Sequence, residues 1–377
     1  MADRSSVLTD ARARVAKVRE DLGFPKQDIW ESLTAVQREE WTRLLRIKDN
    51  MIAASVKTLA QNLYTSKARF VFELLQNAED NHYEEARKRG QAPCVSFHVY
   101  PHKIVQECNE DGFTDANLKA ICAVGQSSKH GGQGYVGEKG IGFKSVFMAA
   151  YRVHIQSGGL SFSFEHRVSD TGLGMVTPEW QDPQDDLEEH LSRITLLLHD
   201  EGHAEELARQ RARIREQFAE IHDTILLFLK KLDQIVVVFH DDVEDEAKVT
   251  KRITFTINRQ ETGRRVLTKR TSEGDSTTED TKYYHITQQD EAPVLHDQWV
   301  FAFLPVQKTR FKFLIQADFV TQANRQGIVV DSPRNEGLRR GIIDAFITAT
   351  KQMCKHPTLR FQWMRYLPKP DDTIDSY

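Results

Sequence analysis

Apolar and polar residues alternate along residues 94–108, where Val95, Phe97 and Val99 are separated by polar neighbours. A period of two is typical of a strand with one buried face. The intervening "PHK" at 101–103 predicts the turn of a hairpin. The same alternation, or a short continuous apolar run, predicts further strands at 151–159, 160–167, 192–200, 234–239, 282–287, 298–306 and 311–319.

Between the strands, longer stretches have helical spacing of their apolar residues. Residues 1–65 are predicted to form helices with polar faces, and residues 66–90 a helix that ends at Gly90 before Pro93. Thr114 is a suitable N-cap for the next helix. Later helices are predicted at 115–124, 143–151, 204–232 and 335–353, with hairpin loops at 240–248 and 271–280. The pattern predicts an α+β protein with a helical segment at 1–60, a first domain at 61–215 and a second at 216–377.

The helix at 66–90 carries an unusual row of polar residues. At about 100° per residue, Glu73, Asn77 and Asp80 lie on one narrow face, with Asn81 beside it. Burying such a row is costly unless it meets a ligand, a metal ion or hydrogen-bond partners. An amide oxygen suits Mg²⁺, and a nearby carboxylate can orient or deprotonate water. The alternative is a solvated helix face.

A glycine-rich segment follows at 125–142, "GQSSKHGGQGYVGEKGIG", with seven glycines in eighteen residues. It lacks the preceding strand of a dinucleotide-binding fold, and Phe143 interrupts the Walker pattern. The motifs of protein kinases are also missing. Glycines at 137, 140 and 142 would let backbone N–H groups approach phosphate oxygens before an apolar helix. A flexible loop without a ligand is the alternative.

Composition narrows the classes of function. The 377 residues carry a net charge of −4, so no strong field favours nucleic acid or a membrane surface. The four cysteines are scattered, which argues against a zinc site or a disulfide framework and indicates an intracellular protein, cytoplasmic or nuclear. The longest apolar runs are too short to span a bilayer.

Three stretches together resemble the GHKL ATPase superfamily of gyrase, the heat-shock chaperones, histidine kinases and MutL. "ELLQNAEDN" resembles its first box, "NEDGF" its adenine box and "GYVGEKGIGFKSVF" its GxxGxG box. More narrowly, these stretches look like the sacsin and No Vein-like branch, and the similarity continues through residues 299–338. The resemblance covers about residues 60–330. It implies a Bergerat-type α/β sandwich, with a mixed, mostly antiparallel sheet covered by helices, followed by a second α/β domain similar to the chaperone middle domain.

The resemblance also implies roles for individual residues. Glu73 would be the general base for the attacking water, Asn77 would bind Mg²⁺, and Arg325 would reach the γ-phosphate of ATP. Asp80 would support the nucleotide side of the helix. Because "NEDGF" departs from the usual DxGxG, the adenine contact falls first to Asn109, with Glu110 and Asp111 as alternatives. The other implied nucleotide-binding residues are Gly112, Phe113, Ser128, Lys129, Gly137, Lys139, Gly140, Ile141, Gly142, Phe143, Lys144 and Ser192.

Three functions are compatible with this pattern. The first is a slow, Mg²⁺-dependent ATPase that acts as a chaperone-like or scaffold switch, with residues 125–136 as a lid over ATP or ADP. The second is a nucleotide-binding scaffold that does not hydrolyse ATP. The third is a histidine kinase, which the acid at position 73 disfavours. A client protein and a homodimer are both compatible with the resemblance.

Overall fold

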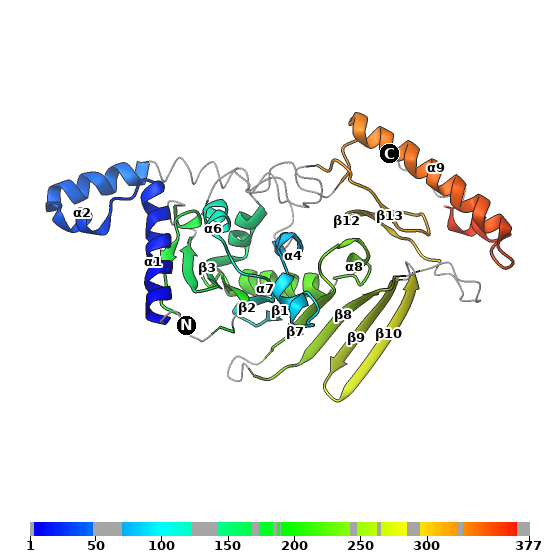
Figure 1. Ribbon diagram of the computed structural model, residues 1–377, viewed down its shortest axis with the longest axis horizontal. Coiled ribbons are helices and arrows are strands. Elements are labelled where there is room, and N and C mark those ends of the chain that lie inside the picture. The colour runs from blue at the N-terminus through cyan, green and yellow to red at the C-terminus, as the bar shows by residue number, and fades with distance from the viewer. Residues whose placement is uncertain are drawn as a thin grey trace. The chain divides into compact units, whose positions relative to one another are not determined.

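The chain forms two compact units in the computed structural model (Figure 1). The structure describes residues 4–47, 70–122, 142–167, 173–183, 187–188, 190–219, 221–241, 247–261, 265–284, 295–322 and 327–367. The first unit is Met1–Leu226, Lys230–Ile257 and Thr268–Thr281. The second is Leu227–Leu229, Asn258–Leu267 and Lys282–Tyr377. The domain boundary at 215/216 stays a prediction.

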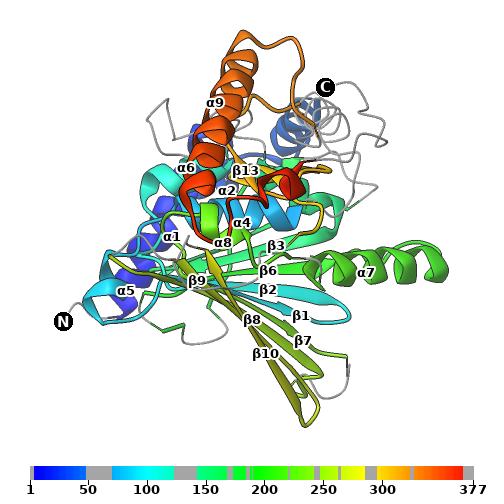
Figure 2. The same cartoon turned by 90° about the vertical axis from the view of Figure 1, so that its right-hand side faces the viewer.

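A ten-stranded sheet organises the fold, in the order β10-β9-β8-β7-β1-β2-β6-β3-β4-β5 (Figure 2). Strand β1 runs parallel to β7 and antiparallel to β2, and the pairs β2–β6, β6–β3, β3–β4, β4–β5 and β7–β8 are antiparallel. The predicted α+β class with a mixed, mostly antiparallel sheet is therefore confirmed. The strands are β1 Cys94–Val99, β2 Lys103–Cys108, β3 Ala150–Ser157, β4 Leu160–Glu165, β5 Glu179–Trp180, β6 Ser192–Leu198, β7 Gln234–Phe239, β8 Lys251–Arg259, β9 Arg265–Glu273 and β10 Ser276–Tyr284.

Helices cover the apolar face of the sheet at β1. The Phe218 ring of α7 (Ala204–Ala219) lies 5.2 Å from the Phe97 ring of β1 and 6.5 Å from the Phe70 ring of α4 (Phe70–Asp80). All three side chains are fully buried. Each buried phenylalanine contributes about 1.5–3 kcal/mol to folding. This packing fixes α4, the helix with the polar row, against the middle of the sheet.

Two helices of the first unit differ from those that the pattern predicts. The helix expected over 66–90 is divided into α4 and α5 (Glu84–Lys88), because the buried Tyr83 hydroxyl donates to the Ala78 carbonyl at 2.7 Å. The helix expected over 143–151 is a 3-10 helix, η1 (Gly142–Met148), followed directly by β3. The others are α1 Arg4–Asp21, α2 Gln27–Ser32, a helix over 35–47, α6 Asp115–Cys122 and η2 Leu173–Met175. Helix α8 (Ile225–Phe228) begins in the first unit and ends in the second.

Two expectations about strands are corrected. The predicted loop at 271–280 is mostly strand, because β9 and β10 meet at a tight turn where Gly274 has φ +56°. The single strand expected over 298–306 is a hairpin, because Phe303 has φ 63° and reverses the chain between Ala302 and Leu304. A run of apolar residues does not by itself indicate where the chain reverses its direction.

The second unit contains a three-stranded sheet and one long helix. The sheet has the order β12-β11-β13, with β11 Trp299–Ala302, β12 Leu304–Lys308 and β13 Ile315–Gln316. Helix α9 (Pro333–Lys355) begins after Ser332, whose hydroxyl accepts from the Asn335 amide, and a 3-10 helix, η3 (Trp363–Tyr366), follows it. Leu338 and Ile342 of α9 pack on the core formed by Val300, Ile315 and Phe319.

Candidate functional site

The polar row on α4 is buried rather than solvated. The side chains of Glu73 and Asp80 belong to residues that are 5% and 4% exposed, and Asn77 between them is half-buried. In the part of the chain that the structure describes, the Asn77 side-chain amide makes no hydrogen bond. A half-buried amide beside a buried carboxylate is well suited to bind a polar ligand.

Gly142, the last glycine of the GxxGxG box, lies directly against Glu73. A Cβ atom built on Gly142 would stand 2.1 Å from Glu73 Oε2 and 3.0 Å from its Cδ. Only glycine leaves space for the carboxylate, and Gly142 does not have the positive φ that would be a separate reason for glycine. Two boxes far apart in the sequence therefore meet at one point, where backbone and carboxylate are in contact.

The amine of Lys144, two residues after Gly142, donates its hydrogen bonds to backbone carbonyls. Its Nζ donates to the Ile121 carbonyl at 2.6 Å and to the Met175 carbonyl at 2.5 Å, and lies 4.8 Å from the centre of the Phe164 ring. Burial lowers the pKa of Lys144 from 10.5 to about 8. Its amine thus connects α6 and η2 to η1, while Phe143 packs edge-on against Phe164 at 6.5 Å.

The "NEDGF" loop is held by hydrogen bonds of its own side chains. The Asn109 amide donates to the Ala92 carbonyl at 2.9 Å and its oxygen accepts from the Cys94 amide at 2.8 Å. The Asp111 carboxylate accepts from the first amides of α5, those of Glu84 and Glu85, at 3.0 and 2.9 Å. Glu110 is buried. The adenine contact stays a prediction for all three, and Asn109 and Asp111 would have to share their present bonds with a base.

The second half of this loop is linked to Ser192 through the hydroxyl of Ser157. The nucleotide contacts of Phe113 and Ser192 stay predictions. The Phe113 amide donates to Ser157 Oγ at 2.9 Å, and Ser157 Oγ lies 2.5 Å from Ser192 Oγ. Gly112 takes a left-handed conformation with φ +97° next to Ser157. Ser157 is a residue that sequence reasoning missed, since one serine at the end of a strand has no distinguishing pattern.

A cavity of about 590 Å³ opens beside this loop. Asp111, Gly112 and Ser157 form part of its wall, together with the β3–β4 turn and residues Val7 and Leu8 of α1. The NEDGF loop is therefore accessible from this side.

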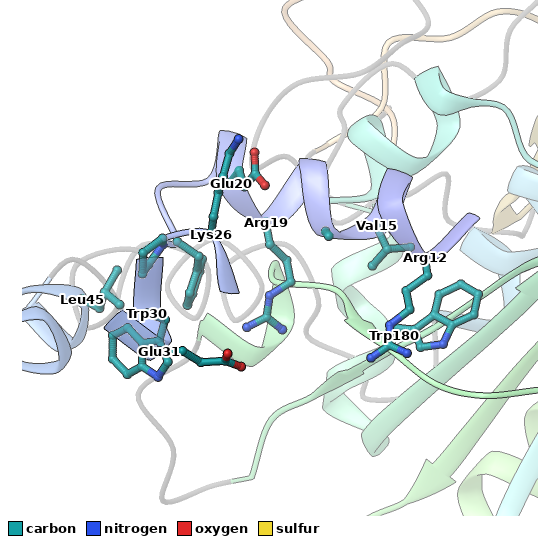
Figure 3. Close-up of a pocket in the computed structure, with 12 residues that line it drawn as sticks. Arg12, Val15, Arg19, Glu20, Lys26, Trp30, Glu31, Leu45 and Trp180 are labelled. Carbon is teal, nitrogen blue, oxygen red and sulfur yellow. The ribbon is translucent and has the colours of Figure 1, made fainter. Parts of the chain in front are cut away.

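A second cavity, of about 750 Å³, lies among the N-terminal helices (Figure 3). Arg12, Arg19 and Lys26 line it with Trp30 of α2 and Trp180 of β5. Its described lining contains no residue of α4 or η1. It is a separate hollow from the polar row on α4.

Several expected site residues lie outside the described ranges. These are Ser128, Lys129, Gly137, Lys139, Gly140, Ile141 and Arg325, together with the lid at 125–136. Their roles stay predictions. Within the described ranges, no group of three His, Cys, Asp or Glu residues is arranged to hold a metal ion, and no helix is long and apolar enough to cross a membrane.

Comparisons with known proteins give one strong sequence match. No family model matches the chain. The chain is 31% identical over 383 residues to the protein NO VEIN of Arabidopsis thaliana, an alignment that covers 94% of this chain. It spans only 13% of the length of that protein. The match supports the No Vein-like resemblance that the three boxes suggest.

A similarity among solved structures is weaker. The B subunit of DNA gyrase from Myxococcus xanthus aligns with 78% of this chain and 93% of its own, at 12% identity and a TM-score of 0.39.

Proposed function

We propose that this chain binds ATP with Mg²⁺ where α4 meets η1, and hydrolyses it slowly as a GHKL-type ATPase. The observation that carries the proposal is the contact between Gly142 and the buried Glu73 carboxylate. It joins an acid that can activate water to the last residue of a glycine-rich box, a sequence whose backbone N–H groups can approach phosphate oxygens. The match to the protein NO VEIN and the order of the three boxes support the same proposal.

The residues present fit a magnesium nucleotide. Mg²⁺ prefers oxygen ligands and keeps several of its waters, so one amide oxygen with nucleotide phosphates is a sufficient set. Asn77 offers that oxygen, one helical turn from Glu73. When bound, Mg²⁺ would neutralise charge on the phosphates. Glu73 would align the water and accept its proton, and backbone amides near Gly142 would hold phosphate oxygens.

Finer parts of the proposal rest on the resemblance. Residues 125–136 would act as the lid, Arg325 would offset charge on the γ-phosphate, and nucleotide state would control a partner protein. Turnover would be slow because closure of the lid would limit it.

Calorimetry with ATP and ADP, with and without Mg²⁺, tests binding, and phosphate release tests hydrolysis. We expect Mg²⁺-dependent ATP binding, and we expect Asn77→Ala to abolish that dependence. Glu73→Gln should lower phosphate release by about 10²- to 10⁴-fold while ATP still binds. Glu216→Gln, an exposed acid on α7, is the matched control and should change neither quantity.

Each alternative function has its own result in these assays. Binding of ATP without phosphate release would indicate the non-hydrolysing scaffold. Unchanged release in Glu73→Gln would exclude Glu73 as the base. Absence of binding by either nucleotide would refute the proposal.

A further inference from the structure

Glu79, in the last turn of α4, binds a distant stretch of backbone. Its Oε1 accepts from the amides of Lys230 at 2.6 Å and Lys231 at 3.0 Å. Its Oε2 accepts from the amides of Leu232 at 3.0 Å and Lys231 at 3.2 Å. Three consecutive amides that converge on one anion form a nest, an arrangement that holds a carboxylate in a fixed place.

Lys231 binds α4 in the opposite direction. Its Nζ donates to the carbonyls of Asp80 and Asn81, both at 2.8 Å. These carbonyls end the helix, where a cation is favoured by the helix dipole. Arg87 adds a bond to the Lys231 carbonyl at 3.3 Å. The end of α4 and residues 230–232 are thus joined by both backbone and side chains.

The Glu79 link lies in the interior of the first unit. Glu79 is 3% exposed, and Leu232 is fully buried. Burial raises the pKa of Glu79, and its hydrogen bonds to the three amides partly offset that effect. A buried carboxylate is stable only when it has strong hydrogen-bond partners. Without the Glu79 carboxylate, the three backbone amides would lose their hydrogen-bond acceptor. The link is therefore specific to a carboxylate that reaches all three amides.

Residues 230–232 directly follow the point where the chain visits the second unit. Ile225 and Leu226 belong to the first unit, Leu227–Leu229 to the second, and the chain returns to the first at Lys230. Within the second unit, the Phe228 ring lies 4.4 Å from the Phe301 ring of β11, and the Leu229 carbonyl accepts from Arg259 Nη2 at 2.7 Å. Two of the three residues, Phe228 and Leu229, are thus packed and hydrogen-bonded there.

Helix α4 carries both the proposed nucleotide-binding residues, Glu73 and Asn77, and the carboxylate of Glu79 that binds residues 230–232. Glu79 is two positions from Asn77 and six from Glu73, which places it on another side of the helix from both. We propose that Glu79 is a positioning residue that couples α4 to the crossing at 227–229. A nucleotide bound at Glu73 and Asn77 thereby alters the second unit through the covalent connection of the chain at these residues. This inference rests on the proposed nucleotide site. A rigid helix whose position both sites share is the kind of element that carries such coupling.

Hydrogen exchange by mass spectrometry tests the coupling, with ATP affinity measured in parallel. In the wild-type chain, ATP with Mg²⁺ should slow exchange in peptides that cover 227–232 and β11. Glu79→Gln keeps the size of the side chain but puts an NH₂ group where an amide needs an acceptor. We expect exchange of 230–232 to become at least about tenfold faster without nucleotide. ATP affinity should change less than about threefold, and the nucleotide effect on β11 should fall to below a third.

Controls separate this role from a general loss of structure. Glu84→Gln, an exposed acid at the start of α5, should behave as the wild type. Glu79→Asp keeps the charge and should restore part of the nucleotide effect. If Glu79→Gln fails to fold, Lys231→Met replaces it, because it removes the bonds to the Asp80 and Asn81 carbonyls while keeping the three backbone amides on Glu79, and it should weaken the same effect.

The outcomes distinguish this inference from the proposed function. ATP binding without any change in β11, or a full change that persists in the folded variant, would overturn the coupling and leave nucleotide binding intact. Absence of ATP binding by the wild type would overturn both. Loss of the β11 response with ATP affinity retained would support the inference.

Discussion

Replacing Gly142 by alanine tests the geometry of the proposed site most directly. The new Cβ would stand 2.1 Å from Glu73 Oε2, whereas a close carbon–oxygen contact needs about 3.3 Å. The carboxylate must therefore retreat by about 1.2 Å. A misplacement of this size costs about 10²-fold in rate, which corresponds to about 2.7 kcal/mol. We expect kcat for phosphate release to fall about 100-fold.

Stability should change much less than activity in Gly142→Ala. The atom that must move is the end of a side chain rather than backbone, and an off-rotamer side chain costs about 0.5–1.5 kcal/mol. Alanine also lowers the entropy of the unfolded chain, which offsets about 0.4–1 kcal/mol. The melting temperature should stay within about 4 °C of the wild type. The matched control is Gly341→Ala in α9, where a Cβ meets nothing within 4 Å.

Phosphate release, thermal melting and ATP calorimetry on the same preparations decide the outcome. A folded Gly142→Ala variant with unchanged kcat would show that the Glu73 carboxylate at this position has no part in catalysis. Weaker ATP binding with unchanged kcat at saturating ATP would indicate that the glycine serves only to bind the phosphates.

Three further predictions concern stability. Because burial lowers the pKa of Lys144 to about 8, the unfolded chain holds this proton more tightly, and the free energy of unfolding should rise by up to about 3 kcal/mol between pH 8 and 10.5. Urea titrations at about pH 8 and about pH 10.5 should show a smaller rise for Lys144→Met than for the wild type. An equal rise in both proteins would contradict the lowered pKa of Lys144. Gly174→Ala would place a Cβ 1.4 Å from the Glu165 carbonyl oxygen, so backbone must move and the melting temperature should fall by about 6 °C or more, whereas a change under about 2 °C would disprove that close approach. Asp111→Ala removes the acceptor for two first-turn amides of α5 and should cost about 1–2 kcal/mol in urea unfolding; unchanged stability with weakened ATP binding would assign this carboxylate to the nucleotide instead.

The spacing of apolar and polar residues predicted the helices and strands that have one buried and one exposed face. The alternation of Val95, Phe97 and Val99 predicted β1, and the hairpin to β2 followed from the turn at 101–103. The end of α9 was predicted within two residues from its helical spacing. Such features depend on which face of a segment is buried, and that information lies in neighbouring residues.

Local pattern failed where a tertiary contact changes the chain direction. The buried Tyr83 divides the helix expected over 66–90, and Phe303 reverses a continuous apolar run. A residue with a positive φ or a buried hydroxyl gives no periodic signal. Both need the surrounding structure to hold them in place.

The candidate site also has some features that the local sequence predicts and others that depend on tertiary contacts. Helical geometry places Glu73, Asn77 and Asp80 on one face of α4 from their spacing in the sequence. The spacing of the glycines in 137–142 likewise made a phosphate-binding turn a reasonable hypothesis. Residue type and local spacing are enough for such statements.

Which groups come into contact follows from the packing of distant segments. This packing brought Gly142 against Glu73, placed β7 parallel to β1, and gave Glu79 its three amides at 230–232. It also gave two carbonyl partners to the amine of Lys144, a residue that the resemblance implies is near the nucleotide. The physical reason is that periodicity records which face of a segment is buried, whereas the partner of that face depends on the packing of segments distant in the chain.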